Sequence, residues 1–286
     1  MPHHRLALVL ACLVASPLAA QTGQPPGGAP PGMAPDAPAG DWAVEVGVGT
    51  FYAPAFLGSD DYQLFGGPTV SVRYKDRVFV SADGIGADLV RSSAWRLGPI
   101  LKVQLPRRET NGNALRLAGA RSDALRGLGD VGTTPELGGY VEYRWRALLA
   151  RAELRQGIGG HEGAIGDLSL RTLLPLAAPT PGRLPLALAL GVRASVVDAR
   201  YNAAYFGIGA AQSAASGLAR YDAGGGLLSA GTNAAVIVPL SPRLTASVLA
   251  GYDRLTGDAA RSPLVEERGT RDQLSVGLGF TFRLGR

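Results

Sequence analysis

The last thirteen residues, LSVGLGFTFRLGR (274–286), alternate between large apolar side chains and small or polar ones. Every second residue from Leu274 to Phe282 is apolar, and the residues between them are serine, glycine, glycine and threonine. A period of two is typical of a β-strand, because successive side chains point to opposite faces. The apolar face of such a strand either packs in the core of a soluble β-sandwich or faces lipid in a membrane barrel.

The same alternation recurs along the chain, and the charged residues keep to one parity of each segment. In ALLARAELRQ (147–156), for example, Arg151, Glu153 and Arg155 share one face, and the other face carries Leu148, Ala150, Ala152 and Leu154. A cation on the lipid face near the bilayer centre costs about 2 to 4 kcal/mol, so a barrel keeps its charges in the lumen. We expect an internal lattice of ion pairs, which would account for the excess of arginine. The residues expected in it are Glu45, Arg73, Glu142, Arg144, Arg151, Glu153, Arg155, Asp167, Arg171 and Arg193.

A periplasmic β-sandwich would show the same alternation, so further features must separate it from a membrane barrel. Small residues crowd the polar face, predicted strands run to about ten residues, and aromatic residues gather at strand ends as in an interfacial girdle. The aromatic residues at these ends are Trp42, Tyr74, Trp95, Trp145 and Phe282. These features favour the barrel.

The N-terminus indicates export from the cytoplasm. Residues 1–20 combine a basic start, an apolar stretch and two small residues before Gln21, which is typical of a secretory signal peptide. The stretch is shorter than the roughly 20 residues of a membrane-spanning helix. Its Cys12 is the only cysteine, and the residues before it loosely resemble a lipoprotein cleavage box, so a lipidated N-terminus is the alternative. Cleavage near Gln21 leaves a mature chain without disulfides or thiolate metal sites.

Two further regions follow the predicted signal peptide. Residues 21–40 consist mostly of proline, glycine, alanine and glutamine, which predicts a disordered spacer. A proline-rich recognition motif is the alternative, although basic residues do not frame a PxxP there. Residues 41–286 are predicted to form one all-β domain. The net charge is +5, but the arginines are spread along the chain, which argues against a nucleic-acid-binding stripe.

Predicted connections alternate between short and long, as in outer-membrane barrels with tight periplasmic turns and long outer loops. The short connections are 75–77, 145–147 and 239–243, and the long ones are 53–66, 106–133, 198–220 and 256–270. An even strand number requires VFVSAD (78–83) and GADLV (86–90) to be two short strands joined by a tight turn at Gly84. The sequence therefore predicts an all-β, transmembrane, antiparallel up-and-down β-barrel of about 12 strands, with 10 as the alternative.

Glycines on the polar parity predict close contact between neighbouring strands. Gly47 and Gly49 lie in the first predicted strand, and Gly277 and Gly279 lie in the last. Because these pairs lie within strands, they do not form a dinucleotide-binding loop. We expect them to make room for bulky side chains from neighbouring strands.

With the strands placed, the chain from about Trp42 to Phe282 resembles the MipA/OmpV family of MltA-interacting outer-membrane proteins of Gram-negative bacteria. The segments that carry the resemblance are FYAPAFLGSDDY (51–62), VRYKDRVFVS (72–81), GHEG (160–163), DARYNAAYFGI (198–208), SGLARYDAGGGL (216–227) and GYDRLTGDAARSPLVEERGTRDQ (251–273). The resemblance implies a barrel in the cell outer membrane with no established enzymatic activity. It further implies a scaffold that bridges a lytic murein transglycosylase and a penicillin-binding protein, whereas other members resemble immunogenic or adhesive surface proteins.

The opening stretch is then interpreted as the closing strand of the barrel, paired with the first strand near Trp42. Phe280 and Phe282 resemble the C-terminal signal recognised by the barrel assembly machinery. That signal usually ends on an aromatic residue, whereas four residues follow Phe282 here.

One histidine, His161, remains after signal-peptide cleavage, in a predicted outer turn. A catalytic triad could be drawn with Glu162 or Asp167 and with Ser169. A histidine flanked by glycines is more often a hydrogen-bonded turn residue, so we expect no catalytic residue and no enzyme. A single histidine without cysteine also argues against a transition-metal site.

Two outer loops carry residues with alternative roles. Ser59, Asp60 and Asp61 could bind Ca²⁺, although we expect them to form a turn and to pair with metal or arginine at the surface. The aromatic residues of 201–206 form either an adhesive patch or a packed loop over the barrel mouth. We expect neither a cofactor nor a metal.

The sequence thus predicts a non-enzymatic outer-membrane scaffold for murein-remodelling and murein-synthesising enzymes. Its expected partners are outer-membrane lipid, the barrel assembly machinery, a lytic transglycosylase and a penicillin-binding protein, and nucleic acid is excluded. A narrow pore or uptake channel is one alternative, although a crowded lumen of twelve strands argues against it. A surface adhesin acting through 106–133 and 198–220 is the other.

Overall fold

A computed structural model describes residues 41–110, 115–119, 122–177 and 185–284 of the chain. The predicted signal peptide (1–20) and the predicted spacer (21–40) lie outside the described residues. In the described part, no helix has the length and apolar character needed to cross a membrane.

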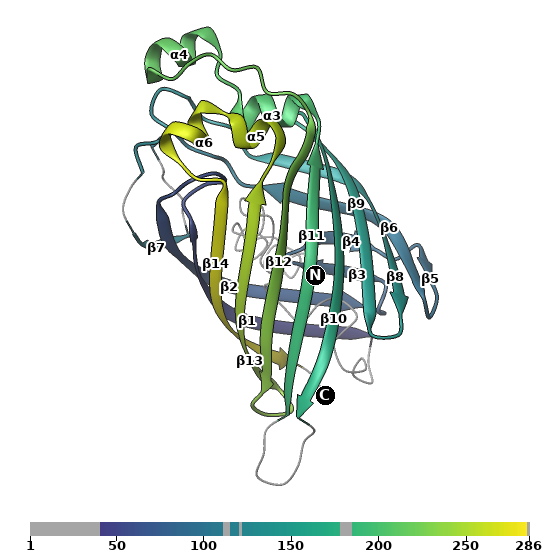
Figure 1. Cartoon of the computed structure of the whole chain (residues 1–286). Helices are drawn as coiled ribbons and strands as arrows, with labels where there is room; N and C mark the ends of the chain where they lie inside the picture. The colour runs from purple at the N-terminus through teal and green to yellow at the C-terminus, as the bar shows by residue number, and fades with distance from the viewer. Residues whose placement is uncertain (1–40, 111–114, 120–121, 178–184, 285–286) are drawn as a thin grey trace, which may run out of the picture.

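Twelve antiparallel strands close into a barrel (Figure 1). In order around the wall they are β1 (Trp42–Pro54), β2 (Tyr62–Tyr74), β3 (Val78–Ser81), β4 (Gly84–Ala87), β6 (Trp95–Gln104), β8 (Thr134–Trp145), β9 (Leu148–Gly157), β10 (Ala164–Ala177), β11 (Leu186–Val197), β12 (Gly226–Pro239), β13 (Leu244–Leu255) and β14 (Asp272–Leu284). Two short strands, β5 (Val90–Arg91) and β7 (Arg116–Ala118), pair with β6 and β2. The predicted barrel of twelve strands is confirmed, and the alternative of ten is excluded.

The last strand closes the barrel against the first. β14 pairs with β1 from Val44 opposite Leu284 to Tyr52 opposite Val276, and β1 pairs with β2 along its whole length. Backbone groups cannot remain unpaired in hydrocarbon, so this closure satisfies the main constraint on a membrane sheet. The interpretation of 274–286 as the closing strand is confirmed for its described residues.

The two short strands predicted after β2 are present, but their turn differs from the prediction. β3 and β4 have four residues each, and Ala82 and Asp83 form the turn. Gly84 is instead the first residue of β4, where its φ of 121° favours glycine. A Cβ at this position would lie 2.6 Å from the carbonyl oxygen of Leu101, so Gly84 also lets β4 approach β6 closely.

The apolar face of the wall points outward and the charged face points inward. On β9, Leu154 is 67% exposed, whereas its neighbours Glu153 and Arg155 are 9% and 5% exposed. A soluble sandwich would bury the leucine and expose the charges. The observed burial is therefore that of a membrane barrel.

Short turns and aromatic side chains mark the periplasmic end of the barrel. In the turn between β2 and β3, Lys75 and Asp76 have φ of 48° and 53°, and the Arg77 amide donates to the Tyr74 carbonyl at 2.9 Å, as in a type I′ hairpin. At the same end, Trp42 packs against Tyr74 with ring centroids 4.4 Å apart. The pair Trp95 and Tyr143 has the same spacing. By the rule that outer-membrane barrels have short periplasmic turns, this girdle lies at the periplasmic leaflet.

Four helices cover the opposite, outer end, where only loops were predicted (Figure 1). They are α3 (Ala199–Phe206), α4 (Ala210–Ser216), α5 (Gly257–Arg261) and α6 (Pro263–Arg268). β1 and β2 also extend into the predicted loop 53–66, so the connection between them is only 55–61. The helices carry the largest apolar clusters of the described residues, which include Phe206, Leu255, Leu264 and Val265.

The barrel interior also contains apolar layers, which the alternation pattern did not predict. Phe79, Ile100 and Tyr140 form one buried cluster near the periplasmic end. Ala189, Ala235 and Leu249 form another on the opposite part of the wall, with Phe51 packed against it. The lumen thus contains apolar as well as charged side chains.

Candidate functional site

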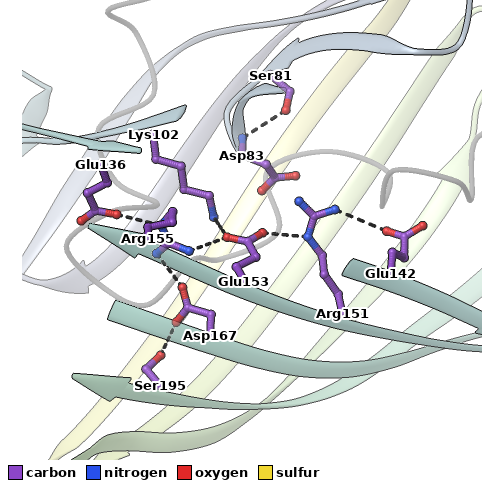
Figure 2. A network of polar contacts seen from close by, with 10 residues as sticks. All are labelled: Ser81, Asp83, Lys102, Glu136, Glu142, Arg151, Glu153, Arg155, Asp167 and Ser195. Atoms are coloured by element: carbon purple, nitrogen blue, oxygen red, sulfur yellow. Dashed lines mark hydrogen bonds and ion pairs between the residues drawn. The ribbon is translucent and has the colours of Figure 1, made fainter. Parts of the chain in front are cut away.

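The densest polar cluster of the described residues lies inside the barrel on five neighbouring strands, β6 and β8 to β11. Register places Glu142 of β8 opposite Arg151 of β9. It also places Asp167 of β10 between Glu153 of β9 and Ser195 of β11. All five side chains point into the lumen because they share the inward parity of their strands. Figure 2 shows that they approach one another across the strands.

Arg155 is the centre of this interior network. Its Nε donates to Glu136 Oε2 at 2.8 Å, and its Nη2 donates to Asp167 Oδ2 at 2.6 Å. Its Nη1 donates to Glu153, and Ser195 Oγ donates to the other oxygen of Asp167 at 2.6 Å. One guanidinium therefore joins carboxylates of three strands, as its planar set of donors allows.

Two further cations complete the interior network. Lys102 Nζ lies 2.7 Å from Glu153 Oε2. Arg151 donates from Nε to Glu153 Oε1 at 2.7 Å and from Nη1 to Glu142 Oε2 at 3.4 Å. Every buried carboxylate of the network has a cationic partner, which a charge needs to remain ionised away from water.

His161 links the interior network to the outer end of the barrel. The Gly163 amide donates to Nδ1 at 3.1 Å, so Nε2 carries the proton and donates to Glu136 Oε1 at 3.1 Å. The ring fits against Gly157, where a Cβ would lie 2.3 Å from it. Both ring nitrogens are thus engaged in structural hydrogen bonds, and neither bonds to Glu162, Asp167 or Ser169.

Helix α3 packs directly on this histidine. Asp198 begins the helix by accepting from the Tyr201 amide at 2.9 Å, and Tyr201 packs edge-on against His161 with centroids 4.8 Å apart. Tyr201, Tyr205 and Phe206 are all buried. Burial raises the pKa of the Tyr201 phenol well above its usual range. These aromatic residues form a packed cover over the barrel mouth, and the alternative of an exposed adhesive patch is not observed.

Arg107 forms hydrogen bonds to the C-terminal end of α3. It donates to the carbonyls of Tyr205 and Ala204, the latter at 3.3 Å, at the helix end where a cation is favoured. Burial lowers the pKa of the Arg107 guanidinium to about 10, which leaves it cationic at neutral pH. Ser262, at the start of α6, donates to the Phe206 carbonyl at 2.7 Å. We refer to α3, α5 and α6 with these contacts as the outer cap.

Several residues expected in one lattice lie in separate places. Arg193 pairs with Asp253, with Nε 2.7 Å from Oδ1, on the other part of the wall. Glu45 pairs with Arg283 at 3.2 Å, which connects β1 to β14. Arg73 lies 3.6 Å from Asp76 at the periplasmic end. The expected residues Arg144 and Arg171 also point inward but are not members of the interior network.

The prediction omitted Lys102, Glu136 and Asp253, which the structure places in these contacts. Glu136 shares the parity of Glu142 on the same strand, and Lys102 shares that of Gln104, so alternation could have identified both. It could not have selected Asp253 as the partner of Arg193, because that choice depends on register across three strands.

The excess of cations lies at the periplasmic rim and not in the interior. Among the described residues, the interior holds five cationic and six acidic residues, and the outer end holds ten cationic and twelve acidic residues. We define the periplasmic rim as the turns at that end, the three residues of each strand that adjoin a turn, and Glu45. Among the described residues it holds four acidic ones, Asp41, Glu45, Asp76 and Asp88, and nine cationic ones, Arg73, Lys75, Arg77, Arg91, Arg96, Arg144, Arg146, Arg243 and Arg283. The internal ion pairs therefore explain the buried charges but do not account for the arginine excess.

The loop of Ser59, Asp60 and Asp61 is a hydrogen-bonded turn. Ser59 Oγ accepts from the Asp61 amide at 3.1 Å, and the Gly58 amide donates to Gln273 Oε1 at 3.0 Å. In the described residues, no group of three or more histidine, cysteine, aspartate or glutamate side chains could hold a metal ion.

The two C-terminal phenylalanines lie on the lipid face near the periplasmic end. Phe280 stands opposite Val48 of β1, and Phe282 stands opposite Val46. Each is 40% exposed. Their role as an assembly signal stays a prediction.

Comparison with known proteins yields one family and a set of distant structural neighbours. The family described as MltA-interacting protein MipA matches residues 46–284. Among solved structures, the NanC porin is 10% identical, with a TM-score of 0.41 over 84% of this chain and 100% of that chain. An outer-membrane channel from Pseudomonas putida F1 is 12% identical, with a TM-score of 0.44 over 87% of this chain and 100% of that chain. The comparison with curated proteins gave no significant match.

The family match includes most of β1 and all the other strands of the barrel wall. It agrees with a closed barrel that exposes an apolar face between an aromatic girdle and an outer cap. The chain therefore belongs to the MltA-interacting protein MipA family and is a β-barrel of the outer membrane.

Proposed function

We propose that this protein is a non-enzymatic scaffold that holds murein-remodelling and murein-synthesising enzymes at the periplasmic side of the outer membrane. The observation that carries the proposal is the family match over residues 46–284, because that family is described by its interaction with MltA. The family resemblance identifies MltA as a lytic murein transglycosylase. A penicillin-binding protein is the second proposed partner.

The side chains inside the barrel favour a scaffold, which acts through its surfaces, over a pore. The network centred on Arg155 lines one part of the interior, buried apolar clusters occupy others, and the outer cap lies over the mouth. A pore needs a continuous path for water. Steady single-channel steps from the purified protein in planar bilayers would favour the pore alternative, and we expect none.

The environment of His161 supports a non-enzymatic role. A histidine that acts as a general base needs a nucleophile within hydrogen-bond reach. The hydrogen bonds of the His161 ring join it to Glu136 and to the Gly163 amide, and the ring packs against Tyr201. We expect the purified protein to hydrolyse neither murein nor phospholipid. A hydrolytic activity abolished by His161→Ala in a folded protein would contradict this expectation.

The decisive experiment is crosslinking in the native membrane, followed by detergent extraction, affinity capture and mass spectrometry. We expect a lytic transglycosylase and a penicillin-binding protein to be recovered with the wild-type protein. A variant that lacks residues 21–40 and carries a glycine-rich turn at 240–243 should lose them, because both changes affect the periplasmic side.

The matched control changes the opposite end. α4 contains no buried residue, so replacing 210–216 with a glycine and serine linker should leave the barrel intact. This variant should capture the same enzymes as the wild type. Capture of assembly machinery alone by all three proteins would contradict the scaffold, and a dependence on 210–216 would favour the adhesin alternative.

A further inference from the structure

The excess of positive charge at the periplasmic rim is concentrated on one arc of the barrel. Of the nine rim cations that the structure describes, seven lie on the consecutive strands β2 to β9 and their turns: Arg73, Lys75, Arg77, Arg91, Arg96, Arg144 and Arg146. We call them the basic arc. Arg91 lies near enough to Arg73, Arg96 and Arg144 for mutual repulsion. Asp76 lies between Lys75 and Arg77 in the sequence and accepts a hydrogen bond from Arg91.

The basic arc lies at the level of the aromatic girdle. Lys75 Nζ lies over the Tyr74 ring, 5.4 Å from its centroid, and the Arg146 guanidinium lies over Trp145 at 5.1 Å. Tryptophan and tyrosine rings of such a girdle mark the headgroup region of a bilayer. The cations that stack on these rings therefore stand beside lipid headgroups.

Several charges of the basic arc are available to a ligand. Arg77 and Arg146 are exposed, and neither forms an ion pair with a carboxylate of the described residues. The ion pair of Lys75 with the exposed Asp41 is long, at 3.8 Å. By contrast, the interior cations of the network are fully paired.

We propose that the basic arc binds the phosphate groups of anionic phospholipids in the periplasmic leaflet. A guanidinium matches the oxygens of a phosphate with two parallel hydrogen bonds. Basic residues next to a membrane-spanning segment are attracted to anionic headgroups. The turns of the arc are short and lie directly beside the girdle, so lipid headgroups are within reach of their cations. The inference is independent of the scaffold role.

The tryptophans of the protein make the proposal directly testable. All three tryptophans, Trp42, Trp95 and Trp145, lie in the girdle, with exposed fractions of 58%, 47% and 54%. Their fluorescence in vesicles can be quenched by brominated phosphatidylglycerol or by brominated phosphatidylcholine. The ratio of the two quenching curves gives the preference for anionic lipid. We expect the full-length wild-type protein to prefer phosphatidylglycerol roughly fivefold or more.

Two triple variants remove the same charge from opposite ends. K75Q/R77Q/R146Q should bring the preference close to one. R108Q/R200Q/R220Q, with three exposed arginines of the outer end, should keep the wild-type preference. Equal quenching of the wild type by both lipids would overturn the proposal. An unchanged preference in the first variant would do the same.

Two further measurements test whether the basic arc binds a different ligand. Inorganic phosphate at constant ionic strength should leave the lipid preference unchanged, and its loss would assign the basic arc to free phosphate. Isolated murein should bind the first triple variant and the wild type equally. Murein binding that depends on these three residues, without lipid preference, would assign the arc to the cell wall. The scaffold is tested separately, because these assays use the purified protein without its proposed enzymes.

Discussion

At the scale of single residues, stability depends on whether each buried charge keeps its partner. Arg155 is the clearest case, because Glu136, Glu153 and Asp167 all accept hydrogen bonds from it. Replacing a buried ion pair as a unit can be nearly neutral, whereas removing one partner leaves an uncompensated charge. The interior network therefore makes the barrel sensitive to single substitutions on its inner face.

Arg155→Leu should destabilise the folded barrel by about 3 to 5 kcal/mol, because it leaves three carboxylates without their common partner. The change is measured as the shift of the urea unfolding curve in micelles, with heat-modifiable mobility as a check of folding. Arg126→Leu is the matched control, because Arg126 pairs with Asp123 at the surface with 73% of its side chain exposed. It should cost about 1 kcal/mol or less. Equal losses in the two variants would show that the interior network contributes no more than a surface pair.

Tyr201 connects pH to the stability of the outer cap. Its phenol is buried, so its folded pKa lies above the unfolded value of about 10. Its stabilising contribution is therefore complete below about pH 10 and is lost as the pH rises further, by about 1.4 kcal/mol per unit. The lowered pKa of Arg107 acts in the opposite direction over that range and is common to both proteins compared.

Tyr201→Phe should consequently flatten the alkaline loss of stability. Unfolding midpoints measured from pH 8 to 11 should fall for the wild type above pH 10 and fall less for the variant. Identical pH profiles would show that burial does not raise the pKa of the Tyr201 phenol.

At the scale of elements, glycines decide how closely neighbouring strands and rings approach. The ring of Phe51 on β1 fills the space above Gly277 on β14, where a Cβ would lie 2.4 Å from two ring atoms. Gly49, two residues before Phe51, has more room, because its Cβ would lie 3.4 Å from the nearest ring atom. The expectation that inward glycines make room for bulky neighbours therefore describes Gly277 better than Gly49.

Gly277→Ala should cost about 1 to 3 kcal/mol, because the ring of Phe51 must leave its position in a packed interior. Gly49→Ala, on the neighbouring strand, should cost clearly less. Both are measured as shifts in the unfolding curve at constant slope. A larger loss for Gly49→Ala would contradict the contact with Phe51 as the cause.

The helices show a second effect at this scale. The long outer connections contain helix signals that alternation does not detect: Asp198 caps α3, and Pro263 occupies the first turn of α6. These signals are local and could have been recognised. Their packing into one cap depends on contacts such as that of Ser262 with Phe206, 56 residues apart in sequence.

At the scale of the whole molecule, the bilayer acts as the solvent for the outward face. Leu278, in the middle of β14, and Leu284, at its periplasmic end, are equally exposed at 44% and 43%. They differ only in their depth along the strand. The cost of a charge at each position therefore reports how the barrel sits in the membrane.

Leu278→Arg should cost about 2 to 4 kcal/mol, whereas Leu284→Arg should cost about 1 kcal/mol or less, because the penalty falls toward the interface. Unfolding and refolding in lipid vesicles measures both. In detergent micelles, which adapt to the protein, we expect the difference to shrink. Equal costs in vesicles would place Leu278 away from the hydrocarbon centre.

The sequence by itself determined the features that depend on neighbouring residues along one strand. Alternation, the parity of charges such as Arg151 and Glu153, and aromatic strand ends such as Trp42 are local, since a strand points successive side chains to opposite faces. From them followed the barrel, its strand number and its closure by residues 274–284.

Only the tertiary structure decided which charges meet and where the excess charge lies. Arg193 binds Asp253, 60 positions away in the sequence, and Arg107 donates to the carbonyl of Ala204 in α3, 97 positions away. Register and barrel curvature bring these residues together. The cap likewise forms from two connections that are distant in the chain. The basic arc arises because short turns from different strands end at one level of the barrel, a consequence of closure that no single segment contains.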